Sequence, residues 1–196
     1  RSIIKADQIV TVSTATKTDL KRYFPDRKNI HVTHLGSSMK HYNTKKPPNA
    51  INGDEKFILM TGNISPRKNI SRAIEALNMI GDKTDIKLLL AGGVSKESQD
   101  VLQKIIDANL ADRVIVAGFL TDEELAWCYE NAEMLLFCSI YEGFGLPPLE
   151  AMRHNLPVIA SNVTSIPEVV GDAALMINPY SVDEIADGIM ELLTNQ

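Results

Sequence analysis

The chain has 196 residues, of which 44% are hydrophobic, so it is long enough to bury a core without disulfides or structural metals. A formal charge of −5 and the lack of any block of Lys or Arg argue against nucleic acid or anionic lipid as the main partner. Because no apolar run approaches the roughly 20 residues that cross a bilayer, and no signal-peptide pattern opens the chain, we expect a cytoplasmic protein.

The first forty residues predict a small segment of mixed structure. Short strands are expected at Gln8–Val12 and Ile30–Thr33, with a helix at Ala15–Phe24 between them. Turn-forming residues then crowd residues 45–54, which indicates a linker or an exposed connection. The chain opens on Arg1 rather than on Met, so we expect a fragment or a processed chain.

From about residue 56 onwards, short apolar runs alternate with stretches of helical periodicity, as in βα units around a parallel sheet. The expected strands are Phe57–Thr61, Lys87–Ala91, Val114–Ala117, Met134–Cys138, Pro157–Ala160 and Ala174–Ile177. The expected helices are Asn69–Ile80, Lys96–Asn109, Asp122–Asn131, Leu146–Arg153, Ile166–Val170 and Val182–Leu193. We therefore predict an α/β fold with a Rossmann-like parallel sheet of six strands.

The loop Gly62–Asn69 holds the first candidate site, because ligands of open parallel sheets bind beyond the carboxyl ends of the strands. Gly62 permits a tight exit from the preceding strand, and Pro66 stiffens the approach to Arg67 and Lys68, which stand just before a helix. Two cations beside the first amides of a helix suit a diphosphate. The alternative is a solvated Arg-Lys pair.

The loop Ser139–Glu150 holds the second candidate site. Gly143 and Gly145 let backbone amides approach a ligand, and two prolines follow that fit the first turn of a helix. Glu142 and Glu150 stand at opposite ends of the loop, so two carboxylates can face one crevice, one near a sugar and one near a ribose. The alternative is an ordinary glutamate at a helix start and another on the surface.

The loop Ala117–Thr121 is the third candidate, since it joins a strand to a helix that Thr121 and Glu124 start with a capping box. Phe119 and the backbone beside it can face a flat base. For the Phe119 side chain itself we favour the alternative, a hydrophobic staple on the next helix. Gly92 and its neighbouring glycine add a weak close-approach signal that does not complete G-x-G-x-x-G.

We expect neither a metal site nor a cofactor, because the required spacings are missing. No two aspartates stand two residues apart, and a metal-like spacing is also missing from the histidines, His31, His34, His41 and His154. Cys128 and Cys138 have no C-x-x-C or related spacing, so both are expected to be buried, reduced thiols. Trp127 and Tyr129 are expected to pack in the core rather than to stack on a ligand.

Taken together, these loops resemble the large family of retaining GT-B glycosyltransferases known as family 4 or group 1. The run Tyr141–Met152 is similar to the signature of that family almost residue for residue, which makes it a specific match. Gly62–Asn69 resembles the family's diphosphate loop, and Ile166–Ala174 its late helix and strand. Ala6–Ser13 resembles the closing strand of its N-terminal domain, and His34–Gly36 the entry to its C-terminal domain.

The resemblance implies that Arg67 and Lys68 hold the diphosphate of the donor and that Glu142 holds the transferred sugar. These three residues are therefore the catalytic candidates. Many members of the family carry Arg where this chain has Asn63, so fewer positive charges are expected around the diphosphate here.

Further donor contacts are implied in the same way. Glu150 would bind the ribose hydroxyls, Gly62 would belong to the diphosphate loop, and the backbone near Phe119 would meet the base. The amides that would meet sugar and phosphate lie around Phe144, Gly145 and Leu146.

The resemblance also implies a division into domains, with residues 41–196 as the nucleotide-sugar-binding, C-terminal domain of a GT-B fold. Residues 1–40 would be a remnant of the N-terminal domain or a hinge. The acceptor-binding N-terminal domain would lie outside this chain, so the chain alone is expected to be inactive. Any membrane contact would run through that other domain.

The implied reaction is the transfer of a hexose from a nucleoside diphosphate sugar, GDP-mannose or a UDP-hexose, to an acceptor hydroxyl. The anomeric configuration would be retained and no metal used, and the wording of the signature favours mannose as the sugar. Two alternatives stay open. One is a non-catalytic module that binds nucleotide sugars, and the other is a nucleotide-sugar epimerase of related fold.

Overall fold

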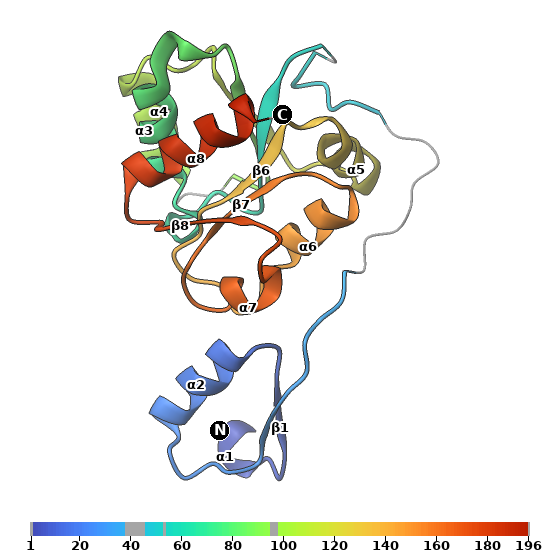
Figure 1. Cartoon of the computed structure of the whole chain (residues 1–196). Helices are drawn as coiled ribbons and strands as arrows, with labels where there is room; N and C mark the ends of the chain where they lie inside the picture. The colour runs from blue at the N-terminus through green and yellow to red at the C-terminus, as the bar shows by residue number, and fades with distance from the viewer. Residues whose placement is uncertain (1, 38–45, 53, 95–97, 196) are drawn as a thin grey trace.

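A parallel sheet of six strands forms the centre of the molecule (Figure 1). The structure, a computed structural model, describes residues 2–37, 46–52, 54–94 and 98–195. The strands of the sheet are β3 (Phe57–Thr61), β4 (Lys87–Ala91), β5 (Val114–Gly118), β6 (Met134–Phe137), β7 (Val158–Ser161) and β8 (Leu175–Ile177). Their order is β5-β4-β3-β6-β7-β8, and every neighbouring pair runs parallel.

The strand order reverses between β3 and β6. From β3 the chain moves outward through β4 to β5, and it then crosses back to place β6 on the other side of β3 before continuing to β7 and β8. Loops that leave neighbouring strands at such a point turn to opposite faces of the sheet and open a crevice between them. By this rule, a ligand crevice is expected where the first two candidate loops begin.

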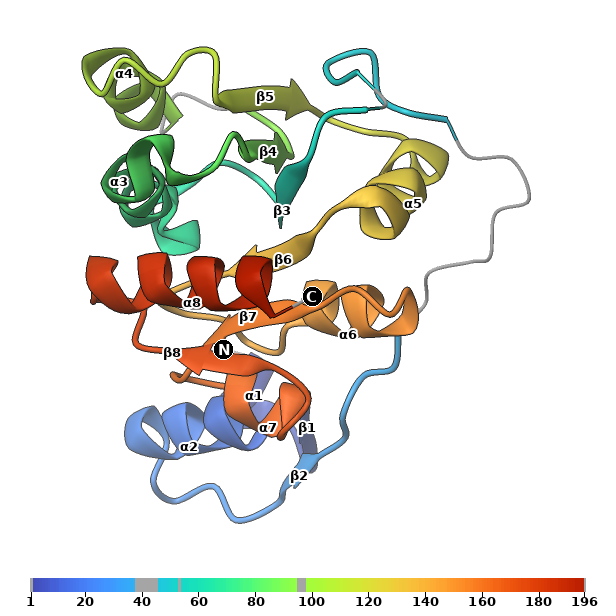
Figure 2. The same cartoon turned by 45° about the horizontal axis from the view of Figure 1, so that its top comes forward.

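Helices cover both faces of the sheet (Figure 2). One face carries α3 (Ile70–Ile80), α4 (Gln99–Asp107) and α8 (Val182–Thr194), and the other carries α5 (Asp122–Asn131), α6 (Leu146–Arg153) and α7 (Ile166–Val170). Successive residues of a strand point to opposite faces, so Ile58 packs with the first layer and Leu59 with the second. Burial on both faces explains why the strand sequences are continuously apolar.

The first residues form a small unit beside the main sheet. It contains α1 (Ser2–Lys5), β1 (Ile9–Thr11), α2 (Thr14–Tyr23) and β2 (Ile30–Val32), and β1 pairs with β2 in parallel. In Figure 1 this unit lies next to α7, with the start of α2 directed towards the main sheet. We call residues 2–37 the first segment; its assignment to a neighbouring domain stays a prediction.

The predicted elements agree with the structure to within one or two residues, apart from one helix start. The predicted helix Lys96–Asn109 is described as Gln99–Asp107, with Ser98 as its N-cap, and residues 95–97 lie outside the described part of the chain. The capping box of Thr121 and Glu124 is present, and both cysteines are buried and free. His41 and two positions of the predicted linker, 45 and 53, also lie outside the described residues.

One side-chain prediction is wrong. Phe119 does not staple the next helix, since 88% of the residue is exposed to solvent. The preceding Gly118 adopts φ +70°, a conformation that turns the chain sharply at the end of β5. The turn directs the ring outward, away from α5.

None of the described helices combines the length and the apolar character that a bilayer crossing requires.

Candidate functional site

The candidate site lies beyond the carboxyl ends of β3 and β6, at the reversal of strand order. The loop after β3 leads into a short 3-10 helix, η1 (Pro66–Lys68), and the loop after β6 leads into α6. The two loops are hydrogen-bonded to each other, because the Ile140 amide donates to the Arg67 carbonyl at 3.0 Å. Two segments about 70 residues apart in sequence thus form one wall of the crevice.

The three predicted catalytic residues come together in this wall. Glu142 Oε2 lies 2.5 Å from Arg67 Nη1, and Glu142 Oε1 lies 3.0 Å from Lys68 Nζ. Arg67 Nη1 also donates to the Tyr141 carbonyl at 3.1 Å, which ties the guanidinium to the same loop. Because two cations share one carboxylate, the cluster has a formal charge of +1.

Lys68 is the buried member of the cluster, with 8% of the residue exposed. Burial lowers the pKa of Lys68 below its usual value, and the nearby Glu142 charge opposes that shift. Lys68 Nζ also lies 4.6 Å from the centroid of the Phe137 ring, which contributes a cation-π contact. A cation held in surroundings of low polarity interacts more strongly with an approaching anion than one in bulk water.

Two glycines make room for Lys68 and its loop. Gly62 adopts φ +102°, and a Cβ at this position would lie 2.8 Å from Lys68 Cε. A Cβ at Gly92 would lie 2.0 Å from the Gly62 carbonyl oxygen, so the loops after β3 and β4 touch through backbone alone. The weak Gly92 signal in the sequence therefore reflects a packing requirement of the loop after β3.

Asn69 holds the loops of the site together, a role that its sequence context does not indicate. It adopts a left-handed conformation (φ 59°) at the start of α3 and is 4% exposed. Its side-chain amide donates to the Cys138 carbonyl at 3.0 Å and to the Pro179 carbonyl at 2.6 Å. One buried amide thus links the loops that follow β3, β6 and β8.

Residues 139–145, which we call the signature loop, lead into α6 at Gly145, whose φ of +127° and ψ of 63° suit only glycine. Leu146 then starts the helix, with prolines in its first turn. Phe144 is buried, at 7% exposure, and its ring centroid lies 5.9 Å from that of His34 in the first segment. The predicted donor-binding residues Phe144, Gly145 and Leu146 therefore stand together at the amino end of α6.

Glu150 lies one turn into α6, and among the described residues it forms no ion pair with the Arg67, Lys68 and Glu142 cluster. Its Oε2 instead accepts a hydrogen bond of 2.8 Å from the Tyr129 hydroxyl of α5. Burial, together with the Glu150 charge, raises the pKa of Tyr129 well above its usual value. The prediction that Tyr129 packs in the core is correct, and its hydrogen bond to Glu150 is a role that the sequence did not indicate.

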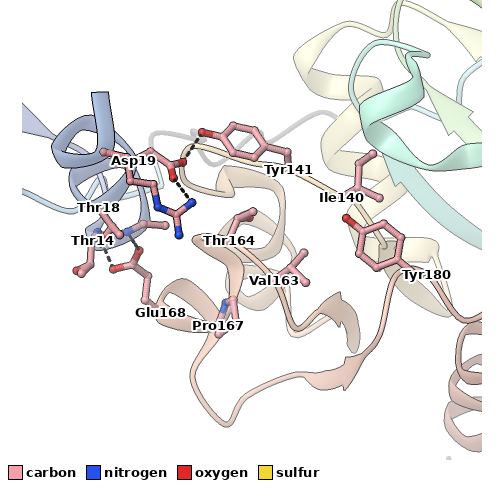
Figure 3. Close-up of a pocket in the computed structure, with 12 residues that line it drawn as sticks. Thr14, Thr18, Asp19, Ile140, Tyr141, Val163, Thr164, Pro167, Glu168 and Tyr180 are labelled. Atoms are coloured by element: carbon pink, nitrogen blue, oxygen red, sulfur yellow. Dashed lines mark hydrogen bonds and ion pairs between the residues drawn. The ribbon is translucent and has the colours of Figure 1, made fainter. Parts of the chain in front are cut away.

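A hollow that sequence reasoning missed lies between α2 and the main sheet. It is an open cavity of about 770 Å³, lined by α2 and by the loops after β6, β7 and β8 (Figure 3). Its polar lining includes Thr14, Thr18, Asp19, Thr164 and Glu168. No predicted site residue lines it, but the hollow adjoins the cluster around Glu142, because the Glu142 amide donates to Thr164 Oγ1 at 3.3 Å and Arg67 Nη1 donates to the Tyr141 carbonyl.

The described residues hold no group of three or more His, Cys, Asp or Glu side chains that could bind a metal ion. The positive groups that the site offers to an anion are Arg67, Lys68 and the backbone amides near Gly145.

The sequence is similar to mannosyltransferases. It is 33% identical to O-antigen chain mannosyltransferase B of Escherichia coli over 201 residues, an alignment that covers 98% of this chain and 53% of that protein. It is 37% identical to serotype-specific mannosyltransferase WbdA of the same organism over 146 residues, or 72% of this chain and 18% of that protein. The chain therefore spans about half the length of the first relative and less of the second.

The structure is similar to sucrose-phosphate synthase from Thermosynechococcus elongatus, with a TM-score of 0.81 and 27% sequence identity. The superposition covers 97% of this chain and 50% of that protein. The predicted fold class, a Rossmann-like parallel sheet of the GT-B glycosyltransferases, is thereby confirmed. The sequence profile of the family described as "Glycosyl transferases group 1" matches residues 42–196. The chain belongs to the group 1 family of glycosyl transferases.

Proposed function

We propose that this chain binds the donor of a retaining hexosyltransferase, a nucleoside diphosphate sugar, and that mannose is the sugar transferred. The observation that carries the proposal is the convergence of Arg67 and Lys68 on Glu142 at the reversal of strand order. Similarity to two mannosyltransferases supports the choice of sugar. GDP-mannose is the first donor to test, and a UDP-hexose is the second.

The proposed chemistry is electrostatic. As the glycosidic bond of the donor breaks, negative charge develops on the β-phosphate, and Lys68, Arg67 and the amides at the start of α6 would stabilise it. Groups that are already oriented by the protein stabilise such charge by several kcal/mol, because little reorganisation is needed during the reaction. The contacts that hold Lys68 over Phe137 and beside Glu142 provide this orientation.

Each of the remaining site residues would contact a different part of the donor. Glu142 would accept hydrogen bonds from hydroxyls of the sugar, since its carboxylate already faces the two cations that would hold the phosphates. Glu150 would accept from the ribose hydroxyls, with one oxygen held by Tyr129. The backbone beside Phe119, at the end of β5, would lie against the base.

The acceptor would bind to a further domain, for which the first segment is the connection. This proposal rests on the share of the relatives that the chain spans and on the separate two-stranded sheet, β1-β2, of residues 2–37. The chain alone would then bind donor and transfer no sugar, because no acceptor wall closes over the crevice and excludes water. Robust sugar transfer by the 196-residue chain would contradict this part.

Titration calorimetry of the 196-residue chain with GDP-mannose, GDP and guanosine tests the proposal, with UDP-glucose, UDP and uridine as the second series. Lys68→Ala is expected to weaken diphosphate binding by about tenfold or more and to leave nucleoside binding unchanged. The loss should shrink as salt is raised. Lys56→Ala is the matched control, because Lys56 pairs with Glu133 at 3.1 Å beside the opposite end of β3. Equal affinities in the two variants would refute the proposal.

A further inference from the structure

Three consecutive carbonyl groups of the signature loop are held by hydroxyl groups. The Gly143 carbonyl accepts from Ser13 Oγ at 2.7 Å and from Thr16 Oγ1 at 3.1 Å. Ser165 Oγ lies 2.9 Å from the Glu142 carbonyl and 2.7 Å from the Phe144 carbonyl, so its single proton is shared between them. Ser13 and Ser165 are fully buried.

These contacts orient the amides that follow. In a trans peptide the carbonyl of one residue and the N–H of the next lie in one plane and point in opposite directions, and the described chain has no cis peptide. Holding the carbonyls of Glu142, Gly143 and Phe144 therefore fixes the N–H groups of Gly143, Phe144 and Gly145. No hydrogen bond from these three amides is found among the described residues.

Two of the three hydroxyl groups come from the first segment, far from the signature loop in sequence. The start of α2 is docked independently of them, because Glu168 of α7 accepts from the Thr14 amide at 2.9 Å and from the Ala15 amide at 3.1 Å (Figure 3). The Tyr141 hydroxyl also contacts Asp19 of α2 at 2.9 Å. These contacts bring Ser13 and Thr16 to the Gly143 carbonyl.

We propose that Ser13, Thr16 and Ser165 form a hydroxyl clamp, a set of positioning residues that aims the Gly143, Phe144 and Gly145 amides at the donor. The clamp does not touch the donor itself; it acts through the backbone of the signature loop. Because two of its members lie on the first segment, the position of α2 sets how well the amides are ordered. The inference rests on the proposed function, since it requires that the loop bind a sugar diphosphate.

Ser13 both caps α2 and holds the Gly143 carbonyl, so the test must separate these two roles. As the N-cap of α2 it accepts a hydrogen bond from the Thr16 amide at 3.0 Å, so Ser13→Ala would weaken the helix as well as the clamp. Thr16→Val removes only a hydroxyl group and keeps the shape of the side chain, whereas Thr16→Ser keeps the hydroxyl. Thr18→Val is the matched control, because Thr18 is an exposed threonine of the same helix outside the clamp.

The test compares a nucleoside diphosphate sugar, which would reach the amides of Gly143, Phe144 and Gly145, with a nucleoside monophosphate, which would not. With Thr16→Val and with Ser165→Ala we expect the affinity for the nucleoside diphosphate sugar to fall by about threefold to tenfold, as for loss of an ordinary hydrogen bond. The affinity for the nucleoside monophosphate should change by less than about twofold, since its contacts lie elsewhere. Thr16→Ser and Thr18→Val should match the original chain with both ligands. A purely structural role would weaken both ligands alike.

NMR provides a second readout. In the chain labelled with ¹⁵N-glycine, the Gly143 and Gly145 amide resonances should shift on addition of the nucleoside diphosphate sugar, and the shifts should shrink in Thr16→Val. If the original chain binds the sugar nucleotide while Thr16→Val and Ser165→Ala bind it equally well, the clamp is refuted and the proposed function stands. If the original chain binds no sugar nucleotide at all, both proposals are overturned.

Discussion

The two ends of the candidate site are built differently. At the diphosphate end, Lys68 is 8% exposed and is held by Glu142, by an aromatic ring and by close-packed glycine backbone. At the nucleoside end, Phe119 is 88% exposed and the Glu150 carboxylate is held by one hydroxyl. If the proposed function holds, the difference means that the reacting phosphate is oriented closely, because charge stabilisation needs fixed groups, and that the base has a looser setting.

The largest expected effect of a substitution lies in the close-packed backbone of the diphosphate end. Gly92→Ala would place a Cβ 2.0 Å from the Gly62 carbonyl oxygen, so the loops after β3 and β4 must move apart. We expect the free energy of unfolding to fall by about 3 kcal/mol, as for a severe overpacking change. Urea denaturation measures it. Gly36→Ala is the control, because a Cβ there meets nothing within 4 Å; equal stabilities of the two variants would contradict the packing argument.

The next effect concerns the proposed contact between Glu150 and the ribose. Glu150→Ala should weaken ribonucleotide binding by about 1.5 to 3 kcal/mol, the value of a charged hydrogen bond, and a 2′,3′-dideoxy nucleotide should hardly respond. Calorimetric titration of both nucleotides measures the difference. Glu191→Ala, an exposed glutamate on α8, serves as the control. Ribonucleotide binding that survives Glu150→Ala would make Glu150 an ordinary helix residue.

A smaller effect should follow from the lowered pKa of Lys68, which burial causes. As the pH rises, a buried lysine loses its proton before a free lysine does, so the affinity for a diphosphate should begin to fall below the usual lysine pKa of 10.5. The same shift means that the folded state, which disfavours the charged lysine, gains stability as the pH rises from the folded towards the unfolded pKa. In Lys68→Arg the fall should move to higher pH. Titration at a series of pH values checks this, and identical pH profiles would contradict it.

The smallest effect is expected at Phe119. Because the ring is almost fully exposed, Phe119→Ala should change the free energy of unfolding by less than about 0.5 kcal/mol. If only the backbone beside it meets the base, the preference between guanosine and uridine nucleotides should also stay unchanged. Thermal unfolding and competitive titration measure the two quantities. A clear loss of base preference would show that the ring itself contacts the base and that the nucleoside end is less open than described.

Most of the secondary structure could be predicted because it depends on neighbouring residues. The apolar runs of β3 and β6 stand out in the sequence, since both faces of each strand are buried. The start of α5 was also readable, because Thr121 and Glu124 satisfy each other's backbone amides within a single turn. The predicted packing of Phe119 on the next helix was wrong, because the sequence does not show that Gly118 adopts φ +70° and turns the chain before the ring.

By itself, the sequence determined the family, the order of strands and helices along the chain, and the residue types of the candidate site, because local periodicity and a specific motif record these. Only the tertiary structure decided how those residues pair. Lys68 and Glu142 lie 74 residues apart, and Ser13 lies 130 residues from the Gly143 carbonyl that it holds. Such contacts depend on how separate βα units pack around the sheet, and no pattern of neighbouring residues encodes a distance between two loops.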